Sequence, residues 1–543
     1  MHVHFYDSNV NMSQPFFCHF FYLAHKRSVS AAVRNGKGEC HINEHCIITG
    51  IFVKYGTGTA GTGVFSTLLS GMLHLKESMR RGGENNMKLA YSVEEKPPFK
   101  KNLVYAFQQL LAIIAATLLV PALVNLGTAG GTEVTMSQPA ALFGAGAGTL
   151  LYVFCTKKRS PIFLGSSFAF ISPLIGACSF GYFGIFLGAV FAGAVYVILA
   201  VIIAFVGTKW VDRLMPPVII GPTVALIGLS LCTSAVSNLN NTSSGDYNLV
   251  AIFCGLIAFL VTVAASVYGG SHIRMIPFII GILAGYLVAS VFTAIGHAAG
   301  ITYLQIVDYT PLADNFRNLS AASFFSVPQF TFLGMLENGT KSLGGAVGVA
   351  NVLLLFAPVA LVVFAEHIAD HENLSTVIGR NLIKDPGLHR TLLGDGLGSI
   401  LGSLFGGCPN TSYGEAIGCV AITGDASIYT IILTAILCLL CSFFTPFVAF
   451  VNTIPVCVIG GICIALYGFI AVSGLKMIQK VDLDDNRNLF VVSTILVLGI
   501  GGLTLDFVRI QITSIATALL MGILVNLLLH RGDKKAEIAD SEN

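Results

Sequence analysis

Charged residues are scarce in this chain. Asp, Glu, Lys and Arg make up 11% of its 543 residues, where about 25% is usual in a soluble domain. Tryptophan occurs once, and the 13 cysteines show no paired spacing of the kind that holds a metal. The formal net charge is only +2, and no basic patch is interleaved with aromatics. An ordinary water-facing surface, a metal centre and a nucleic-acid partner are therefore not expected.

Long apolar runs take the place of the missing charges. Hydrophobic residues make up 54% of the chain, and the mean hydropathy is +0.78. Runs such as Leu103–Val124 and Tyr182–Val206 carry no charged residue and are long enough to cross a bilayer core of roughly 30 Å. These runs are continuous rather than alternating, which favours helices over barrel strands. We predict an all-α polytopic protein embedded in a lipid bilayer.

The first 86 residues differ from the rest. They are rich in His, Cys, Asn, Ser and Gly and contain neither a long apolar run nor a signal-peptide pattern. Arg80–Glu84 reads Arg-Arg-Gly-Gly-Glu, which a purine-rich stretch resembling a bacterial ribosome-binding site would encode shortly before Met87. We expect Met87 to be the true start and residues 1–86 to be a doubtful or disordered extension.

Fourteen candidate membrane segments follow Met87. They lie near residues 103–126, 140–156, 163–178, 180–206, 216–233, 248–269, 276–296, 350–372, 393–407, 412–423, 427–450, 454–474, 488–504 and 510–530. We predict a first seven-span repeat at 87–296, an external connection at 297–349, a second seven-span repeat at 350–530 and a cytoplasmic tail at 531–543.

Lysine and arginine gather in alternate loops. If the amino terminus is cytoplasmic, the external loops hold only Arg317, Lys341 and Arg509, as the positive-inside rule predicts. Both termini are then cytoplasmic. With an odd number of spans in each half, the second half enters the membrane upside down relative to the first. Such inverted repeats recur in secondary transporters.

The third span of each half is short and polar. Gly, Ser, Pro and Asn interrupt the apolar pattern at 163–173 and again at 406–418. Non-helical backbone at membrane depth is tolerated only inside protein or beside a water-filled cavity. Interrupted segments at matching positions of two halves indicate a binding site between them.

Ionisable residues within the spans are few and are candidates for function. Glu366, His367, Asp370 and His371 lie at the end of the eighth span, and Glu415 lies in the broken tenth span. Glu366 and Asp370 are four residues apart and share one helical face. Burial and like-charged neighbours favour the protonated form of a carboxyl group. Such a cluster suits a carrier that binds and releases a proton.

Alternative roles remain for several of these polar residues. Asp370 and His371 could instead cap the helix or pair with Arg380 at the cytoplasmic boundary. Gln108 and Gln109 in the first span could line the same cavity or form hydrogen bonds between helices.

Four motifs together resemble the nucleobase–ascorbate transporter family and are most similar to its bacterial uracil permeases. They are Gly-Ser-Ser-Phe-Ala-Phe-Ile-Ser-Pro at 165–173, Ala-Glu-His-Ile at 365–368, Asp-Pro-Gly-Leu-His-Arg at 385–390 and Pro-Asn-Thr-Ser-Tyr-Gly-Glu-Ala-Ile-Gly at 409–418. The resemblance extends from about Glu94 to Leu529. It implies fourteen spans in two inverted sevens, with spans 1–4 and 8–11 as a core domain. Spans 5–7 and 12–14 would form a gate domain that supports a homodimer, and the broken spans 3 and 10 would carry short antiparallel strands.

The resemblance also implies roles for individual residues. Glu366 and Glu415 match the two substrate glutamates, and the backbone at Phe168 and Gly414 matches the amides that contact substrate carbonyls. Ala116 and Tyr413 match positions that flank the pocket.

The implied function is proton-coupled import of uracil across the bacterial cytoplasmic membrane by alternating access, with no cofactor besides the coupling proton. Uracil offers two ring N–H donors and two carbonyl acceptors. Two carboxylates suit the donors because charge-assisted hydrogen bonds are the stronger kind, and Phe168 and Tyr413 could cover the ring.

The alternatives are a purine or xanthine permease of the same family and, from another class, a channel or a membrane-embedded enzyme. Xanthine and urate carriers have glutamine-asparagine near the position of Glu415 and Ala416, so a pyrimidine is favoured. In the best-known uracil permease a histidine stands four residues after the eighth-span glutamate, where this chain has Asp370. We therefore expect proton coupling through Asp370 and Glu366, and the role of His371 stays open.

Overall fold

The computed structural model describes residues 89–128, 134–240, 247–339, 343–507 and 510–529. The predictions for residues 1–86, for the start at Met87 and for the tail at 531–543 lie outside these ranges, as do Lys341 and Arg509.

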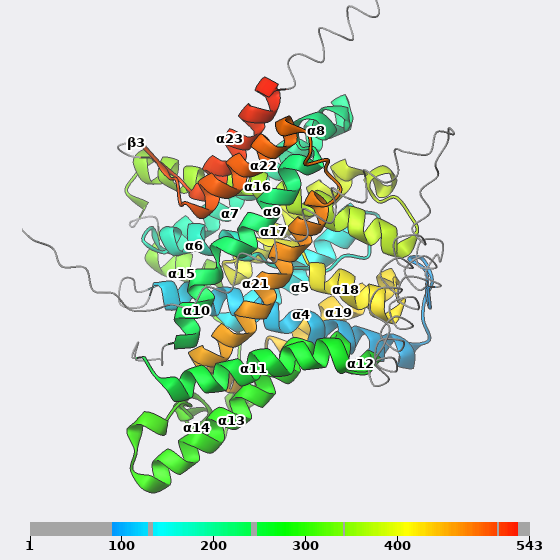
Figure 1. The fold of residues 1–543 in the computed structure, drawn as a ribbon. Coiled ribbons are helices and arrows are strands. Elements are labelled where there is room, and N and C mark those ends of the chain that lie inside the picture. The colour runs from blue at the N-terminus through cyan, green and yellow to red at the C-terminus, as the bar shows by residue number, and fades with distance from the viewer. Residues whose placement is uncertain (1–88, 129–133, 241–246, 340–342, 508–509, 530–543) are drawn as a thin grey trace, which may run out of the picture. The chain divides into compact units, whose positions relative to one another are not determined.

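The described residues form helices joined by short connections (Figure 1). In the first half these are α4 (Phe99–Gly127), α5 (Gln138–Cys155), α6 (Ile171–Cys178), α7 (Gly181–Val206), α8 (Lys209–Leu214), α9 (Pro217–Ser230), α10 (Cys232–Asn240), α11 (Leu249–Tyr268), α12 (Ser271–Met275) and α13 (Pro277–Ala299). The connection holds α14 (Thr310–Arg317) and α15 (Thr331–Asn338). The second half contains α16 (Ala346–Ile378), α17 (Leu388–Gly406), α18 (Gly414–Thr423), α19 (Ile428–Cys441), α20 (Thr445–Asn452), α21 (Val456–Ile478), α22 (Asn486–Ile500) and α23 (Ser514–Leu529).

The mostly helical, multi-span character predicted from the sequence is confirmed. Within the described residues, 8 helices are long and apolar enough to cross a membrane, and shorter apolar helices accompany them. In their most apolar windows, 72% of α4 is buried but only 28% of α13. α4 is therefore an interior helix, whereas α13 presents most of its apolar surface outward.

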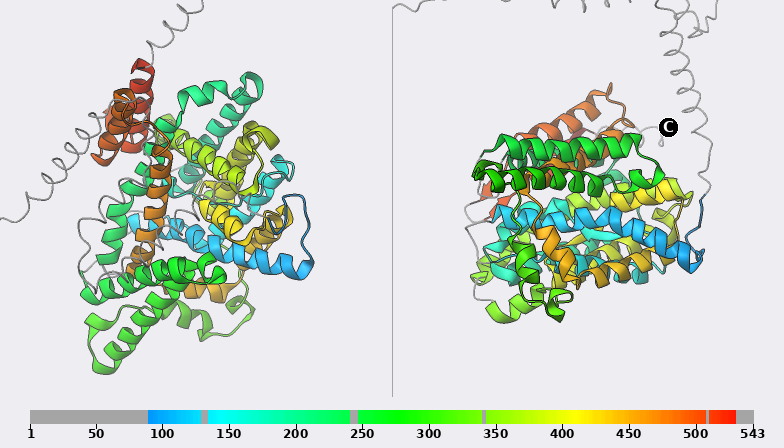
Figure 2. Two further views of the ribbon diagram at one scale, coloured as in Figure 1. Left: turned by 45° about the vertical axis from the view of Figure 1, so that its right-hand side comes forward. Right: turned by 90° about the horizontal axis from the view of Figure 1, so that it is seen from below.

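The helices pack as two groups. The first group contains α4–α7 and α16–α19, among which α17 packs on both α5 and α7, and α19 packs on both α4 and α5. The second group contains α9–α13 and α21–α23, in which α21 packs on α9 and α11 lies beside α13. Figure 2 shows α22 and α23 lying together at one edge of this second group.

Glycines allow α5 and α17 to approach closely at the centre of the first group. A Cβ atom on Gly144 would lie 2.3 Å from the carbonyl oxygen of Gly402, and one on Gly148 would lie 2.8 Å from that of Gly398. No hydrophobic driving force acts between helices in lipid, so the close backbone packing that small residues permit stabilises such contacts instead. The Asn410 side chain also donates to the carbonyl of Gly144 at 2.9 Å.

Two short strands cross beside this helix pair. β1 (Leu164–Ser166) pairs antiparallel with β2 (Asn410–Ser412), with Gly165 opposite Thr411. Separately, β3 (Leu505–Phe507) pairs antiparallel with β4 (Ile510–Ile512). The pairing of β1 and β2 matters for the site, because the short 3₁₀ turn Phe168–Phe170 that leads into α6 follows β1, and α18 follows β2. Two helical segments therefore begin at the same place.

Gly165 leaves the room that this crossing needs. A Cβ atom there would lie 2.2 Å from the Tyr413 ring, and that ring is held because its hydroxyl donates to the carbonyl of Ser166 at 2.8 Å. Gly165→Ala should therefore displace Tyr413 and lower the free energy of unfolding by about 1–3 kcal/mol, which is typical of overpacking. Thermal unfolding of the purified protein measures this. Gly468→Ala is the matched control because no atom lies within 4 Å of its added Cβ; equal melting temperatures for the two variants would contradict the prediction.

Candidate functional site

A cavity of about 370 Å³ lies between the two groups of helices. Its polar lining residues are Ser167, Ser266, Arg274, Glu366, Asp370, Asn373, Thr411, Ser412, Tyr413, Glu415 and Ser473. The first group contributes α4, α16 and the segment from β2 into α18, and the second contributes α9, α11, α12, α13 and α21. Movement of one group relative to the other would therefore change access to this cavity.

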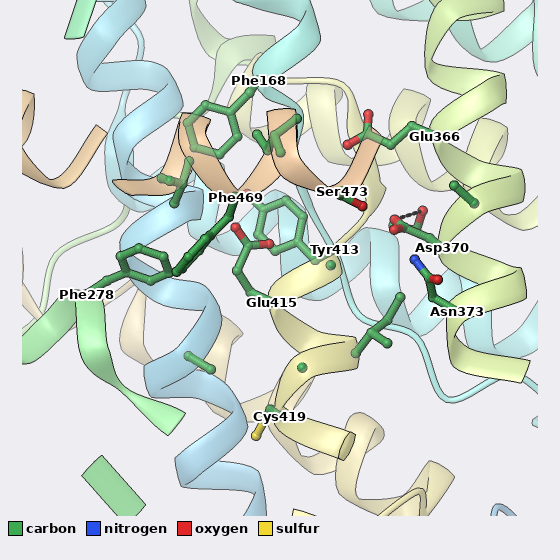
Figure 3. Close-up of a pocket in the computed structure, with 18 of the residues that line it drawn as sticks. Phe168, Phe278, Glu366, Asp370, Asn373, Tyr413, Glu415, Cys419, Phe469 and Ser473 are labelled. Carbon is green, nitrogen blue, oxygen red and sulfur yellow. Dashed lines mark hydrogen bonds between the residues drawn. The ribbon is translucent and has the colours of Figure 1, made fainter. Parts of the chain in front are cut away.

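Three carboxyl groups face the cavity. Figure 3 shows Glu366, Asp370 and Asn373 projecting from α16 into the space that also receives Glu415 from the first turn of α18. Asp370 is 9% exposed, and its carboxylate accepts a hydrogen bond of 3.0 Å from the Ser412 hydroxyl. The apolar environment makes these groups costly to ionise together, so the cavity favours ligands that supply protons or N–H donors.

Two helical segments begin at the cavity wall. Phe168 and Gly414 are the first residues of their helical segments, and a first helical residue has no acceptor for its N–H within the helix. A helix N-terminus carries partial positive charge. The two helical segments thus offer N–H donors beside the carboxylates, and the site can pair both donors and acceptors of a ligand.

Aromatic rings border the other side of the cavity. Phe168 packs edge-on against Tyr467 with ring centroids 5.8 Å apart, and Phe278 packs similarly on Phe469 at 5.9 Å. Phe168 belongs to the first group, whereas Phe278 and Phe469 belong to the second (Figure 3). A flat ligand between these rings would therefore touch both groups at once.

The structure brings together most of the residues that the sequence singled out. Glu366, Asp370, Glu415, Phe168, Gly414 and Tyr413 all line the cavity. Ala116 does not: it is 1% exposed within α4, and Ala112, one turn earlier, lines the cavity instead.

His371 also lies outside the cavity, in the interior of the first group. Its side chain is fully buried. Nδ1 contacts the carbonyl oxygen of His367 at 2.7 Å, and since a carbonyl only accepts, Nδ1 carries the proton. Nε2 lies 2.9 Å from the Tyr152 hydroxyl, which also lies 2.7 Å from the hydroxyl of Ser160. His371 directly follows Asp370 on α16, but this one-residue step turns its side chain toward α5 instead of the cavity.

His367 belongs to a second buried polar pair. Its Nδ1 lies 2.8 Å from a carboxylate oxygen of Asp395 in α17, and its Nε2 lies 3.0 Å from the Thr391 hydroxyl. That hydroxyl donates to the carbonyl of Leu388, so its oxygen accepts from Nε2. The contact between Nδ1 and Asp395 then requires one proton, which is on either the ring nitrogen or the carboxyl oxygen. The sequence reasoning overlooked Asp395, although it lies inside the predicted segment 393–407.

The two glutamines of α4 form contacts between elements. The Gln109 side chain donates to the carbonyl of Ala416 at 3.2 Å, and the Gln108 amide lies 3.2 Å from the His272 ring of α12. Neither is among the cavity-lining residues. Among the described residues, no group of three His, Cys, Asp or Glu side chains is placed to hold a metal ion.

Sequence reasoning missed the second group's share of the cavity. Arg274, Phe278, Phe469 and Ser473 line it but lie in or beside ordinary apolar spans. Only the pairing of these spans with the broken segments would have indicated them.

Comparison with known proteins gives a consistent picture. The family model described as "Permease family" matches residues 100–507. The uracil permease of Bacillus caldolyticus is 36% identical over 455 residues, covering 83% of this chain and 97% of that protein. The uracil permease of Bacillus subtilis is 36% identical over 446 residues, covering 80% and 94%. A murine anion transporter of solute carrier family 26 has a similar fold, with a TM-score of 0.53, 11% identity and coverage of 91% of this chain and 76% of that one.

Proposed function

Because this chain belongs to the permease family, as its motifs indicated, we propose that it is a uracil permease, a secondary active symporter. The similar proteins are named as permeases, which are transporters rather than enzymes. The observation that carries the proposal is the convergence of Glu366, Glu415 and the first residues of two helical segments, Phe168 and Gly414, on one cavity between the two groups of helices.

The helices also suggest how the membrane spans are organised. We assign fourteen spans in two inverted repeats of seven, with the first group of helices as the core domain and the second group as the gate domain. The antiparallel pairing of β1 with β2 supports this assignment, because it relates the broken third span to the broken tenth. We further propose a homodimer in the bacterial cytoplasmic membrane with both termini in the cytoplasm.

Uracil recognition follows from the donors and acceptors that surround the cavity. Glu366 and Glu415 accept the two ring N–H groups, and the backbone N–H groups of Phe168 and Gly414 donate to the carbonyls. A carboxylate acceptor gives a stronger hydrogen bond than a neutral one. Phe168 and Tyr413 cover the ring, and Ala112 rather than the buried Ala116 faces the ligand from α4.

Proton coupling is assigned to Asp370 and Glu366. Both carboxyl groups reach the cavity, so either can exchange a proton with water while the cavity is open. His371 does not reach the cavity. We assign it a positioning role, since its buried hydrogen bonds fix the face of α16 from which Asp370 projects.

The cavity extends in one direction from the glutamates. Asn373, Ser473 and Ile422 line it near the ends of α16, α21 and α18, and we assign these ends to the cytoplasmic side because basic residues gather in the loops there. We therefore infer an inward-facing state, from which an importer releases its substrate.

Uptake of labelled uracil by cells that express the chain tests the proposal. Uptake should rise as the external pH falls and should collapse with an uncoupler, and excess unlabelled uracil should compete while purines should not. Competition by xanthine or guanine would support a purine permease instead. Accumulation that persists with the uncoupler would contradict proton coupling.

A further inference from the structure

A second cavity, of about 360 Å³, lies at the end of the first group where α5 and α16 finish and α19 begins. It is lined by Glu94, Lys157, Lys158, Arg159, Arg380, Asp385, Ile428 and Tyr429. None of these residues lines the cavity between the two groups. Four cationic side chains therefore surround this space, against two carboxylates.

The two arginines of this cavity form ion pairs with its two carboxylates. Arg380 contacts Asp385 at 2.5 Å and also pairs with Glu94, and Arg159 contacts Asp385 at 2.6 Å. The hydrogen bonds from Arg380 and Arg159 hold the pKa of Asp385 below its usual range. The pairs Arg159–Asp385 and Arg380–Glu94 join segments far apart in the sequence, and together the ion pairs form a frame around the space.

Lys157 and Lys158 line the same cavity but take no part in these ion pairs. Both are exposed, and neither side chain forms an ion pair with any residue in the described part of the chain. Their backbone φ angles are 54° and 61°, a left-handed conformation that costs a residue with a Cβ on the order of 1–2 kcal/mol. Glycine would relieve this cost, yet lysine stands at both positions. Non-glycine residues in this region of φ, ψ space cluster at functional sites.

The remaining wall of the cavity is apolar and aromatic. Ile428 is 1% exposed, and the Tyr429 ring also carries the Lys96 ammonium 5.8 Å from its centroid. Close to the two lysines in sequence, Phe154 at the end of α5 is 79% exposed. A cavity of this size lies in the range of small-molecule sites, roughly 300–1,000 Å³, so it can hold more than a bare inorganic ion.

We propose that this cavity binds the phosphate group of an organic phosphate of net negative charge, with Lys157 and Lys158 contacting the phosphate oxygens inside the frame formed by Arg159 and Arg380. Ammonium groups bind phosphate as compact charges, and arginines add hydrogen bonds of fixed geometry. An anionic phospholipid headgroup and a soluble phosphate ester share this chemistry. Basic pockets beside membrane helices bind such headgroups.

Thermal unfolding of the purified full chain in a neutral detergent tests this inference. A short-chain phosphatidylglycerol, the matching phosphatidylcholine and glycerol phosphate are each titrated, and the apparent Kd is taken from the rise in melting temperature. Phosphatidylglycerol has a net negative headgroup and should stabilise the protein, whereas phosphatidylcholine, whose choline cation balances its phosphate, should not. Stabilisation by glycerol phosphate as well would identify a soluble ester as a sufficient ligand, whereas stabilisation by phosphatidylglycerol alone would identify the lipid.

The decisive variant is Lys157→Gln/Lys158→Gln, which should weaken the apparent Kd for phosphatidylglycerol by on the order of tenfold. Lys476→Gln/Lys480→Gln at the end of α21 is the control, since it removes two exposed lysines outside this cavity. Unchanged uracil binding shows that each variant is folded. If the double variant does not fold, the single variants and the loss of wild-type affinity at high salt give the readout. No stabilisation of the wild type by phosphatidylglycerol or by glycerol phosphate, equal stabilisation by phosphatidylcholine, or equal effects of the two double variants would overturn the proposal.

Discussion

Replacing Glu366 by glutamine should weaken uracil binding by about tenfold to a hundredfold. A hydrogen bond to a charged group contributes about 1.5–3 kcal/mol, and each 1.4 kcal/mol corresponds to a factor of about ten in Kd. Glutamine preserves the size of the side chain but replaces a charged acceptor by a neutral amide. Because Glu366 projects into the cavity from the middle of α16 (Figure 3), the loss should appear in binding rather than in folding.

Binding of labelled uracil to the purified protein measures this effect. Glu372→Gln is the matched control, because Glu372 lies on the same helix but is exposed and does not line the cavity. The same substitution at Glu415 should weaken binding comparably if each glutamate accepts one ring N–H. A Kd for Glu366→Gln within about twofold of the wild-type value would remove Glu366 from the substrate contacts.

The helices and the acidic side of the cavity could be predicted from the sequence because both depend on exceptions to an apolar background. Glu366, Asp370 and Glu415 stand out since charges are rare in the spans. The broken segments at β1 and β2 stand out since glycine, serine, proline and asparagine interrupt the helical pattern there. Each signal is local in the sequence, so it can be recognised without knowing how the helices pack.

The second group's face of the cavity could not be predicted in this way. Phe278 and Phe469 lie in helices that are apolar on all sides, because lipid and protein interior are equally apolar neighbours. Hydrophobic periodicity therefore does not show which side of α13 or α21 meets the first group. The different directions of Asp370 and His371, about 100° apart on the helix, depend on the rotation of α16 against α5, which is known only from the packed structure. Asp395 is different, since a carboxylate inside a predicted span was visible in the sequence.

Asp370→Asn should abolish accumulation of uracil against its gradient while leaving exchange largely intact. If one proton enters with each uracil, a pH difference of one unit sustains about tenfold accumulation. Asparagine can still accept the hydrogen bond that the Ser412 hydroxyl gives to Asp370, so the local packing should persist. It cannot take up and release a proton, so the variant loses the coupling step and keeps the binding step.

Proteoliposomes separate these two activities, because accumulation is driven by an imposed pH gradient and exchange by unlabelled uracil on the opposite side. His371→Gln is the informative comparison. Asp370 faces the cavity, whereas His371, the next residue on α16, is buried beside Tyr152. Losing a buried hydrogen bond costs about 1–3 kcal/mol of stability. The His371 variant should therefore melt at a lower temperature yet accumulate uracil normally per folded molecule. Normal accumulation by Asp370→Asn together with failure of His371→Gln would reverse the assignment and place the coupling proton in the buried histidine network instead of the cavity.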